Sequence, residues 1–388
     1  MKKILYTIFI FSSFSLVAQG KKFFESGEVQ LKSTVEKLNL QYAADLPFVK
    51  VNINGKQYNF LFDTGAPTVI STAIYTELGL EKKYKSMVKD SQKNKQDQIF
   101  TVLPEMIVDQ VSFKNIGVVV MDLKAAEFGC LKVDGILGAN QMAKLFWKIN
   151  YAENTLEATQ DLSRFDLKGF DFVIPFNTKD QKTPIVEAKI IDKKIDFTFD
   201  TGFSRNLKIS DGNYNPKKIS EKVEVFGNNS VGAFGAGNSK SGYIFKASDV
   251  LLGNKSFTNE LVMTGSSNLL GNSFLKNFVF VLDWVSHKIY LKQIRNSSSE
   301  LESFGFGYRF IDNKPAVVYV FQEENFPLKV GDSILSINNI DLDNLDHETA
   351  CHYFLNRVEK DADVINMRIK RKGEVMNVNL KKRIYLKD

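Results

Sequence analysis

Two short stretches of the chain carry the residues best suited to chemistry. Residues 60–66 read Phe-Leu-Phe-Asp-Thr-Gly-Ala, and residues 197–203 read Phe-Thr-Phe-Asp-Thr-Gly-Phe. Each places one aspartate, Asp63 or Asp200, at the end of an apolar strand. Two carboxyl groups held against each other cannot both ionise without a large energetic cost, so they share one proton. Such a pair can hydrolyse a peptide bond without a metal, because one carboxyl activates a water while the other protonates the carbonyl oxygen.

The residues beside each aspartate have supporting roles in this hypothesis. Thr64 and Thr201 can form hydrogen bonds to the opposite loop, because a threonine hydroxyl both donates and accepts. Gly65 and Gly202 have no Cβ, so the backbone amides can approach the carboxylates closely. Both stretches therefore predict half of a common site.

The two stretches belong to an internal repeat. Residues 47–65 and 184–202 align without a gap at an offset of 137 (200 − 63), and each segment predicts a β-hairpin that ends at the aspartate. The order of landmarks continues downstream, with an apolar-apolar-Gly element, a short helix and a further apolar strand in each copy. These landmarks are 136–138, 141–145 and 145–151 in the first copy and 269–271, 273–276 and 278–284 in the second. The chain is therefore predicted to be mainly β and built from a duplicated unit.

At these residues the sequence resembles the aspartic peptidases, both the two-lobed pepsin type and the retroviral type. The resemblance runs from about Leu46 to Gln293. It implies two homologous β-barrel lobes, residues 40–165 and 166–295, that form a pseudo-twofold active site within one monomer. It also implies that Asp63 and Asp200 are the catalytic pair, and that the substrate is a polypeptide. The remaining roles that it implies are interlocking threonines at 64 and 201 and buttresses at 136–138 and 269–271.

The second copy departs from the family pattern after its Asp-Thr-Gly. The family places a small residue there, and Ala66 fits, but the second copy has Phe203. A large ring next to Asp200 could desolvate the carboxylate and raise its pKa, or could crowd the substrate channel. Arg205 is a charge partner that would lower the same pKa. This departure leaves open an alternative function, a secreted peptide-binding pseudoprotease without catalytic activity.

Two segments are candidates for a hairpin that closes over a cleft. Residues 89–97 are polar and form a simple solvated hairpin in the alternative interpretation. Residues 227–242 contain several glycines around Phe234 and Gly235, and this backbone freedom favours the second segment as the substrate flap.

A composition change near residue 296 begins a third unit. The polar linker 296–300 precedes residues 300–388, in which the run Leu-Lys-Val-Gly-Asp-Ser-Ile-Leu-Ser-Ile-Asn (328–338) resembles the core of PDZ domains. The resemblance implies a small α+β domain that binds peptide C-termini, with its carboxylate-binding loop at Phe304, Gly305, Phe306 and Gly307. A helix is predicted over 347–358, with Ala350, Tyr353, Phe354 and Val358 on its apolar face. In the alternative interpretation this unit only packs on the rest of the protein.

The remaining features concern location and partners. Residues 1–18 have two lysines, an apolar run and a small residue at the end, which is typical of a secretory signal peptide and predicts an exported protein, periplasmic or secreted. A single membrane anchor is the alternative. Residues 19–39 are a polar lead-in, and no later segment is apolar enough to cross a membrane. Without the signal peptide the formal charge is +4 (6 − 2), too small and too scattered for nucleic-acid binding.

The cysteines and histidines suggest no cofactor. Cys130 and Cys351 lie in different predicted domains and are expected to be two unpaired thiols, although an exported protein could pair them. His287, His347 and His352 have no ligand spacing, so neither a zinc site nor a Ser-His-Asp triad is predicted.

Overall fold

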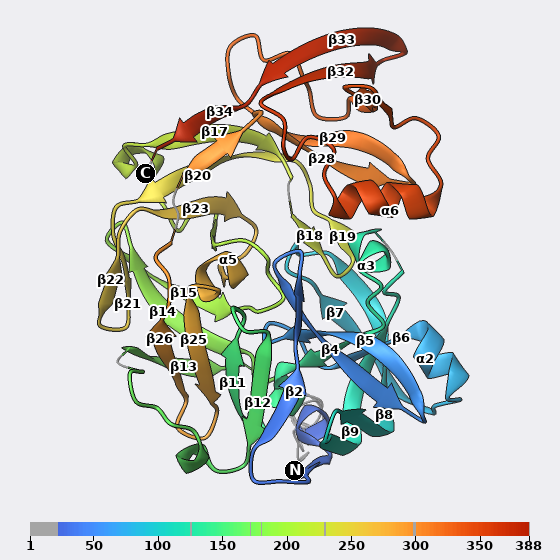
Figure 1. Cartoon of the computed structure of the whole chain (residues 1–388), viewed down its shortest axis with the longest axis vertical. Helices are drawn as coiled ribbons and strands as arrows, with labels where there is room; N and C mark the ends of the chain where they lie inside the picture. Colours follow the sequence, from blue (N-terminus) through green and yellow to red (C-terminus); the bar gives the residue numbers. More distant parts are fainter. Residues whose placement is uncertain are drawn as a thin grey trace, which may run out of the picture.

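The computed structural model describes residues 22–387 except 125, 171, 180, 229, 298 and 299, and it is mainly β as predicted (Figure 1). The predicted signal peptide at 1–18 lies outside the described residues. The chain up to residue 165 is called the first half, residues 166–295 the second half, and residues 301–386 the C-terminal region.

The first half is built around one sheet in which the strand that carries Asp63 is central. The strand order is β1-β9-β6-β10-β5-β4-β8-β7, with β3 also on β4. The strands are β1 (Glu28–Leu31), β3 (Gln41–Ala43), β4 (Leu46–Ile53), β5 (Lys56–Asp63), β6 (Val69–Ser71), β7 (Lys82–Lys89), β8 (Lys95–Val108), β9 (Val111–Met121) and β10 (Gly135–Gly138). Three short helices accompany them, α2 (Thr72–Glu77), α3 (Ala126–Cys130) and α4 (Ala139–Met142).

The second half repeats the central part of this arrangement. Its hairpin of β14 (Pro184–Ile190) and β15 (Lys193–Phe199) corresponds to the β4–β5 hairpin, and α5 (Asn272–Leu275) corresponds to α4. The other strands are β13 (Phe172–Thr178), β16 (Leu207–Ser210), β17 (Lys222–Gly227), β18 (Val231–Gly232), β19 (Gly235–Ala236), β20 (Lys240–Ala247), β21 (Val250–Leu252), β22 (Lys255–Phe257), β23 (Glu260–Gly265) and β24 (Leu269–Leu270). Helices α4 and α5 begin directly after the apolar-apolar-Gly elements, one or two residues earlier than the sequence predicts.

A six-stranded antiparallel sheet joins the two halves. Its order is β2-β12-β11-β25-β26-β13, formed with β2 (Glu36–Asn39), β11 (Phe146–Asn150), β12 (Thr155–Thr159), β25 (Phe278–Asp283) and β26 (Lys288–Gln293). The central pair, β11 and β25, consists of corresponding strands of the two copies, and Trp147 and Phe280 on them are completely buried. Segment 19–39, expected to be a lead-in, supplies β1 and β2. Strand β2 pairs antiparallel with β12, so this segment is part of the six-stranded sheet that joins the two halves.

The C-terminal region has its own hydrophobic core and a single helix among the residues described. Its elements are β27 (Leu301–Ser303), β28 (Phe306–Ile311), β29 (Lys314–Phe321), β30 (Ser333–Ile337), β31 (Ile340–Asp341), α6 (His347–Leu355), β32 (Val364–Arg371), β33 (Glu374–Lys381) and β34 (Arg383–Leu386). Asp346 caps α6 by accepting a hydrogen bond from the Thr349 amide at 2.7 Å. The helix ends three residues before the predicted end, and Phe354 lines a cavity instead of joining the core.

The C-terminal region is attached to both halves (Figure 1). Strand β29 pairs antiparallel with β17 of the second half, from Val225↔Phe321 to Gly227↔Tyr319. On the other side α6 packs against α3 of the first half, where Cys130 and Cys351 form a disulfide with a Cα–Cα distance of 4.9 Å. The prediction of two unpaired thiols is therefore wrong. It failed because the fold brings together two helices that are 221 residues apart, a contact with no local sequence signal.

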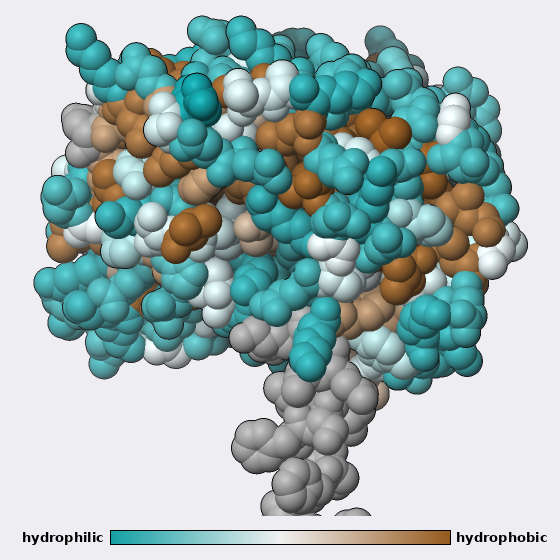
Figure 2. All heavy atoms as spheres, turned by 90° about the horizontal axis from the view of Figure 1, so that it is seen from below, coloured by the Kyte–Doolittle hydropathy of each residue, from teal (hydrophilic) through white to brown (hydrophobic). Residues whose placement is uncertain are grey.

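Polar residues dominate much of the outer surface. The face remote from the C-terminal region shows hydrophobic patches separated by hydrophilic residues (Figure 2). Within the described part of the chain, every helix is too short or too polar to span a bilayer.

The disulfide predicts a redox-dependent stability. Cys351→Ser removes a covalent link that closes a 221-residue loop, and we expect it to lower the free energy of unfolding by about 2–4 kcal/mol. Thermal unfolding with and without a thiol reductant measures this effect. The reductant should lower the Tm of the wild type and leave that of the variant unchanged. An equal Tm of the wild type in both conditions would contradict the assigned pairing.

Candidate functional site

The ends of β5 and β15 are held together by four reciprocal hydrogen bonds. The Thr64 amide donates to Thr201 Oγ1 at 3.0 Å, and the Thr201 amide donates to Thr64 Oγ1 at 3.1 Å. Each hydroxyl also donates to a backbone carbonyl of the opposite half, Thr64 to Phe199 at 2.5 Å and Thr201 to Phe62 at 2.7 Å. Both threonines are completely buried, so these groups have no access to water as an alternative partner. The predicted cross-loop bonding of the threonines is present in the structure.

The two aspartates that precede these threonines face each other. Gly65 N–H donates to Asp63 Oδ1 at 2.7 Å, and Gly202 N–H donates to Asp200 Oδ1 at 2.9 Å. Each glycine also lies against the carboxyl group of the opposite half. A Cβ on Gly65 would come within 2.7 Å of Asp200 Cγ, and one on Gly202 within 2.3 Å of Asp63 Cγ. These two positions therefore require glycine for space, as the sequence predicts.

Burial raises the pKa of both aspartates, while their mutual contact raises the pKa of Asp200 and lowers that of Asp63. Removal from water raises the pKa of Asp63 and of Asp200, because the charged form loses its hydration. The charge of Asp63, and its hydrogen bond to Asp200, raise the pKa of Asp200 further. Hydrogen bonds from the Gly65 and Gly202 amides act in the opposite direction. The two carboxyl groups are therefore expected to titrate as a unit.

Each Asp-Thr-Gly loop is supported by the apolar-apolar-Gly element of its own half. Strand β10 pairs in parallel with β5, up to Gly138↔Asp63, and β24 pairs in parallel with β15. The helices that follow donate equivalent bonds to the loops, from the Ala139 amide to the Ala66 carbonyl at 2.9 Å and from the Asn272 amide to the Phe203 carbonyl at 2.8 Å. The two copies of the repeat therefore use the same backbone hydrogen bond to support their Asp-Thr-Gly loops.

A cavity of about 420 Å³ opens beside Asp200. Its walls come from all three parts of the chain. The first half supplies Leu61 and Phe128, and the second half supplies Phe203. The C-terminal region supplies Tyr308 and Phe354. The α3–α6 contact and the β17–β29 pairing thus hold the C-terminal region at the cavity that Asp200 lines.

Phe203 lies in this cavity wall and has a charged neighbour that the sequence analysis missed. The ammonium of Lys208 on β16 lies 5.1 Å from the centre of the Phe203 ring, a cation–π geometry. Its positive charge lowers the pKa of Asp200, the role expected of Arg205. Arg205 is exposed and lines the same cavity. Leu207, Lys208 and Ile209 are all buried, which the short sequence of this strand does not indicate.

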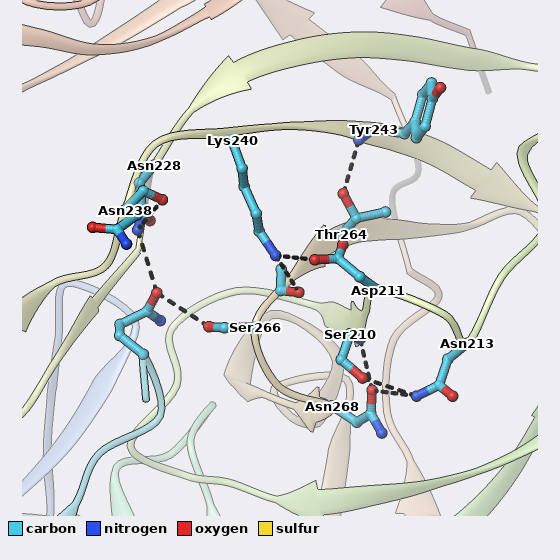
Figure 3. A network of polar contacts seen from close by, with 12 residues as sticks. Ser210, Asp211, Asn213, Asn228, Asn238, Lys240, Tyr243, Thr264, Ser266 and Asn268 are labelled. Atoms are coloured by element: carbon cyan, nitrogen blue, oxygen red, sulfur yellow. Dashed lines mark hydrogen bonds and ion pairs between the residues drawn. The ribbon is translucent and has the colours of Figure 1, made fainter. Parts of the chain in front are cut away.

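The two candidate flap segments meet each other. The β7–β8 turn presents Asp90, which accepts a hydrogen bond from the Phe234 amide at 3.0 Å, and Asn94, which donates to the Gly235 carbonyl at 3.3 Å. The Phe234 ring packs with apolar residues of the first half. On the same turn Gln92 accepts from Ser266 at 3.2 Å and from Asn228, in the network drawn in Figure 3. Both segments therefore contribute to one bridge between the halves.

The predicted carboxylate-binding loop has internal partners. Phe304, Gly305 and Phe306 are buried, and the Gly305 amide donates to Ser303 Oγ at 3.0 Å. On β28, the Tyr308 carbonyl accepts from Arg357 Nη1 at 3.0 Å. Phe306 and Gly307 also line the cavity that contains Asp200. Among the described residues there is no group of three or more His, Cys, Asp or Glu arranged to hold a metal ion.

Part of the chain is similar to a known protein family. Residues 49–141 match the family model described as Aspartyl protease. The match begins within β4 and includes β5 and β10, and it supports an aspartyl protease-like domain, peptidase activity and a polypeptide substrate. No curated protein matches the chain.

The threonine network predicts a symmetric loss of stability. Thr64→Val and Thr201→Val each leave a buried amide and a buried carbonyl without a partner, so we expect each to lower the free energy of unfolding by about 2 kcal/mol or more. The double variant should lose less than the sum, because the two hydroxyls share one network. Urea unfolding followed by tryptophan fluorescence measures the effect. Thr155→Val, at an exposed position of β12, is the control and should change little; single variants no less stable than this control would contradict the prediction.

Proposed function

We propose that this protein is an aspartic-type endopeptidase, with two pepsin-like lobes in one chain and Asp63 and Asp200 as its catalytic pair. The observation that carries the proposal is the pair of buried carboxyl groups, each packed against the glycine of the opposite half. The family match over 49–141 and the duplicated arrangement around β5 and β15 support it. One chain supplies both aspartates, so a monomer is sufficient for the site.

In the proposed mechanism the pair carries one proton in its active form. The ionised carboxyl accepts a proton from a water molecule, and that water attacks the carbonyl carbon of the scissile peptide bond. The protonated carboxyl donates to the carbonyl oxygen, and the tetrahedral intermediate then breaks down with proton transfer to the leaving amine. Thr64, Gly65, Ala66, Thr201, Gly202 and Phe203 maintain the geometry of the pair. The bridge around Phe234 and Gly235 closes over the bound chain.

The C-terminal region is proposed to be a PDZ-like domain that positions the polypeptide substrate. Its strand β28 and helix α6 flank the cavity that contains Asp200, so a chain bound there lies next to the catalytic pair. The bond between Arg357 and the Tyr308 carbonyl occupies one acceptor that a peptide strand would use, and a bound peptide would have to replace it.

Export is the proposed location. The lysines and apolar run of residues 1–18 support it, and so does the Cys130–Cys351 disulfide, because disulfides persist in oxidising compartments.

The catalytic pair is tested by removing either carboxylate. Asp63→Asn and Asp200→Asn each take away one member of a proton-sharing pair, so each should lower kcat/KM at least about 10²–10⁴-fold with little change in Tm. Cleavage of a denatured polypeptide mixture across acidic to neutral pH, resolved by mass spectrometry, measures activity. Near-full activity in either variant would refute the mechanism. Binding without cleavage in the wild type would identify the pseudoprotease alternative.

The pH profile tests the electrostatics around Asp200. Activity ends at high pH when the pair loses its shared proton, and the Lys208 ammonium favours that loss by lowering the pKa of Asp200. Lys208→Met removes the positive charge, so the pKa of Asp200 should rise and the upper limb of the kcat/KM profile should move to higher pH. Lys255→Met is a matched control, since Lys255 lies over the Phe172 ring at 5.7 Å, outside the cavity wall. An upper limb that stays in place or moves to lower pH would contradict this assignment.

A further inference from the structure

Lys208 is a buried lysine whose position has a cost in free energy. Its side chain is 1% exposed, and it lies on β16 between the buried Leu207 and Ile209. Its stem packs against Gly265, where an added Cβ would come within 2.6 Å of Lys208 Cδ. An ammonium removed from water is costly unless it is paired, so such a position calls for a compensating partner. Burial accordingly lowers the pKa of Lys208 to about 8.

The structure contains no hydrogen-bonded partner for this ammonium. Across the described part of the chain, Lys208 Nζ forms neither a hydrogen bond nor an ion pair. The Phe203 ring lies 5.1 Å from it, and the negative charges of Asp200 and Asp90 raise the pKa of Lys208 without a direct bond. Lys240 on β20 provides the contrast in Figure 3, because its ammonium contacts Asp211 and donates to the Gly265 carbonyl at 2.9 Å. Of these two lysines, Lys208 is the one whose ammonium has unused hydrogen-bonding capacity.

Lys208 lines the cavity of about 420 Å³ together with Asp200, Phe203 and Arg205. Arg205 is exposed there, and no described residue forms an ion pair with it. The carboxyl of Asp200 is engaged with Asp63, so it does not neutralise both cations. Among the described residues of the two halves, Asp200 is the acidic residue that lines this cavity, and Asp90 acts on Lys208 from outside the lining.

The opposite wall does not supply the missing anion. Glu359 is the acidic residue of the C-terminal region that lines the cavity, and it accepts a hydrogen bond from the Tyr308 hydroxyl at 2.8 Å. Arg357 adds positive charge to that wall. A ligand that fits this cavity should therefore bring its own negative charge.

We propose that Lys208 and Arg205 form a subsite for a carboxylate group of the polypeptide substrate, next to the catalytic pair. The inference rests on the proposed endopeptidase function and specifies its substrate class. It also explains the large residue after the second Asp-Thr-Gly, since the Phe203 ring stabilises the Lys208 cation while the site is empty. The carboxylate comes from an aspartate or glutamate side chain, or from the C-terminus of the substrate.

The test uses matched peptides at pH 6, where the lysine is protonated. A cleaved peptide is resynthesised with Glu or Gln at each position near the scissile bond, and with a C-terminal acid or amide. We expect one Glu/Gln pair, or the acid/amide pair, to differ about 10-fold or more in kcat/KM in favour of the carboxylate, and the responding pair identifies the source. Lys208→Met should reduce that ratio to near 1, while Lys255→Met keeps it. The ratio cancels any effect of the lysine on the aspartate pair itself.

Two outcomes would overturn the subsite. One is a wild type that cleaves carboxylate and neutral peptides at rates within 2-fold of each other. The other is a Lys208→Met variant that folds with an unchanged Tm or a higher one and keeps the preference. Arg205→Gln provides a second variant at an exposed position, and it should lower the same ratio without affecting folding.

Failure of the subsite and failure of the proposed function give different results. Fluorescence anisotropy with Asp63→Asn measures binding of Glu and Gln peptide libraries without any turnover. A preference for Glu peptides that Lys208→Met abolishes in this background supports the subsite even if the wild type cleaves nothing. Cleavage by the wild type without such a preference leaves the endopeptidase in place and refutes the subsite.

Discussion

The exchange of hydrogen bonds between Thr64 and Thr201 is the interaction on which the rest of the site depends. Each hydroxyl accepts from the amide of the other threonine and donates to a carbonyl of the opposite half. The aspartates are the preceding residues, so the backbone of one half determines where the carboxyl group of the other half lies. Strands β11 and β25 reinforce this at a distance by pairing corresponding strands of the two copies. Neither half contains a complete site.

Burial underlies the chemistry proposed for the aspartate pair because it raises their pKa values. The positive charge of Lys208 acts against this rise at Asp200. A dry environment raises the pKa values of both aspartates. A nearby cation limits the rise, but a cation in the same dry environment is itself costly. The Phe203 ring stabilises that cation without adding a negative charge, which an additional carboxylate would have done.

The parts of the fold that could be predicted from sequence are those with a local pattern or a repeated spacing. The β4–β5 and β14–β15 hairpins follow from alternating apolar residues, and the supports at Gly138 and Gly271 follow from the repeat. Contacts between distant segments carry no such pattern. The Cys130–Cys351 bond depends on how the C-terminal region sits across the first half, and the pairing of β2 with β12 depends on the joined sheet. Lys208 was missed because a lone lysine in a short strand is usually an exposed residue, and only the surrounding strands show it to be buried.

The disulfide makes a covalent ring out of the chain between Cys130 and Cys351. That ring contains the whole second half, the linker near residue 296 and most of β28 to α6. A backbone cut in any loop of the ring leaves both pieces joined through sulfur, so a single nick there releases no fragment. For a protein proposed to cleave polypeptides, such a ring means that self-inflicted cuts in these loops need not separate Asp63 from Asp200.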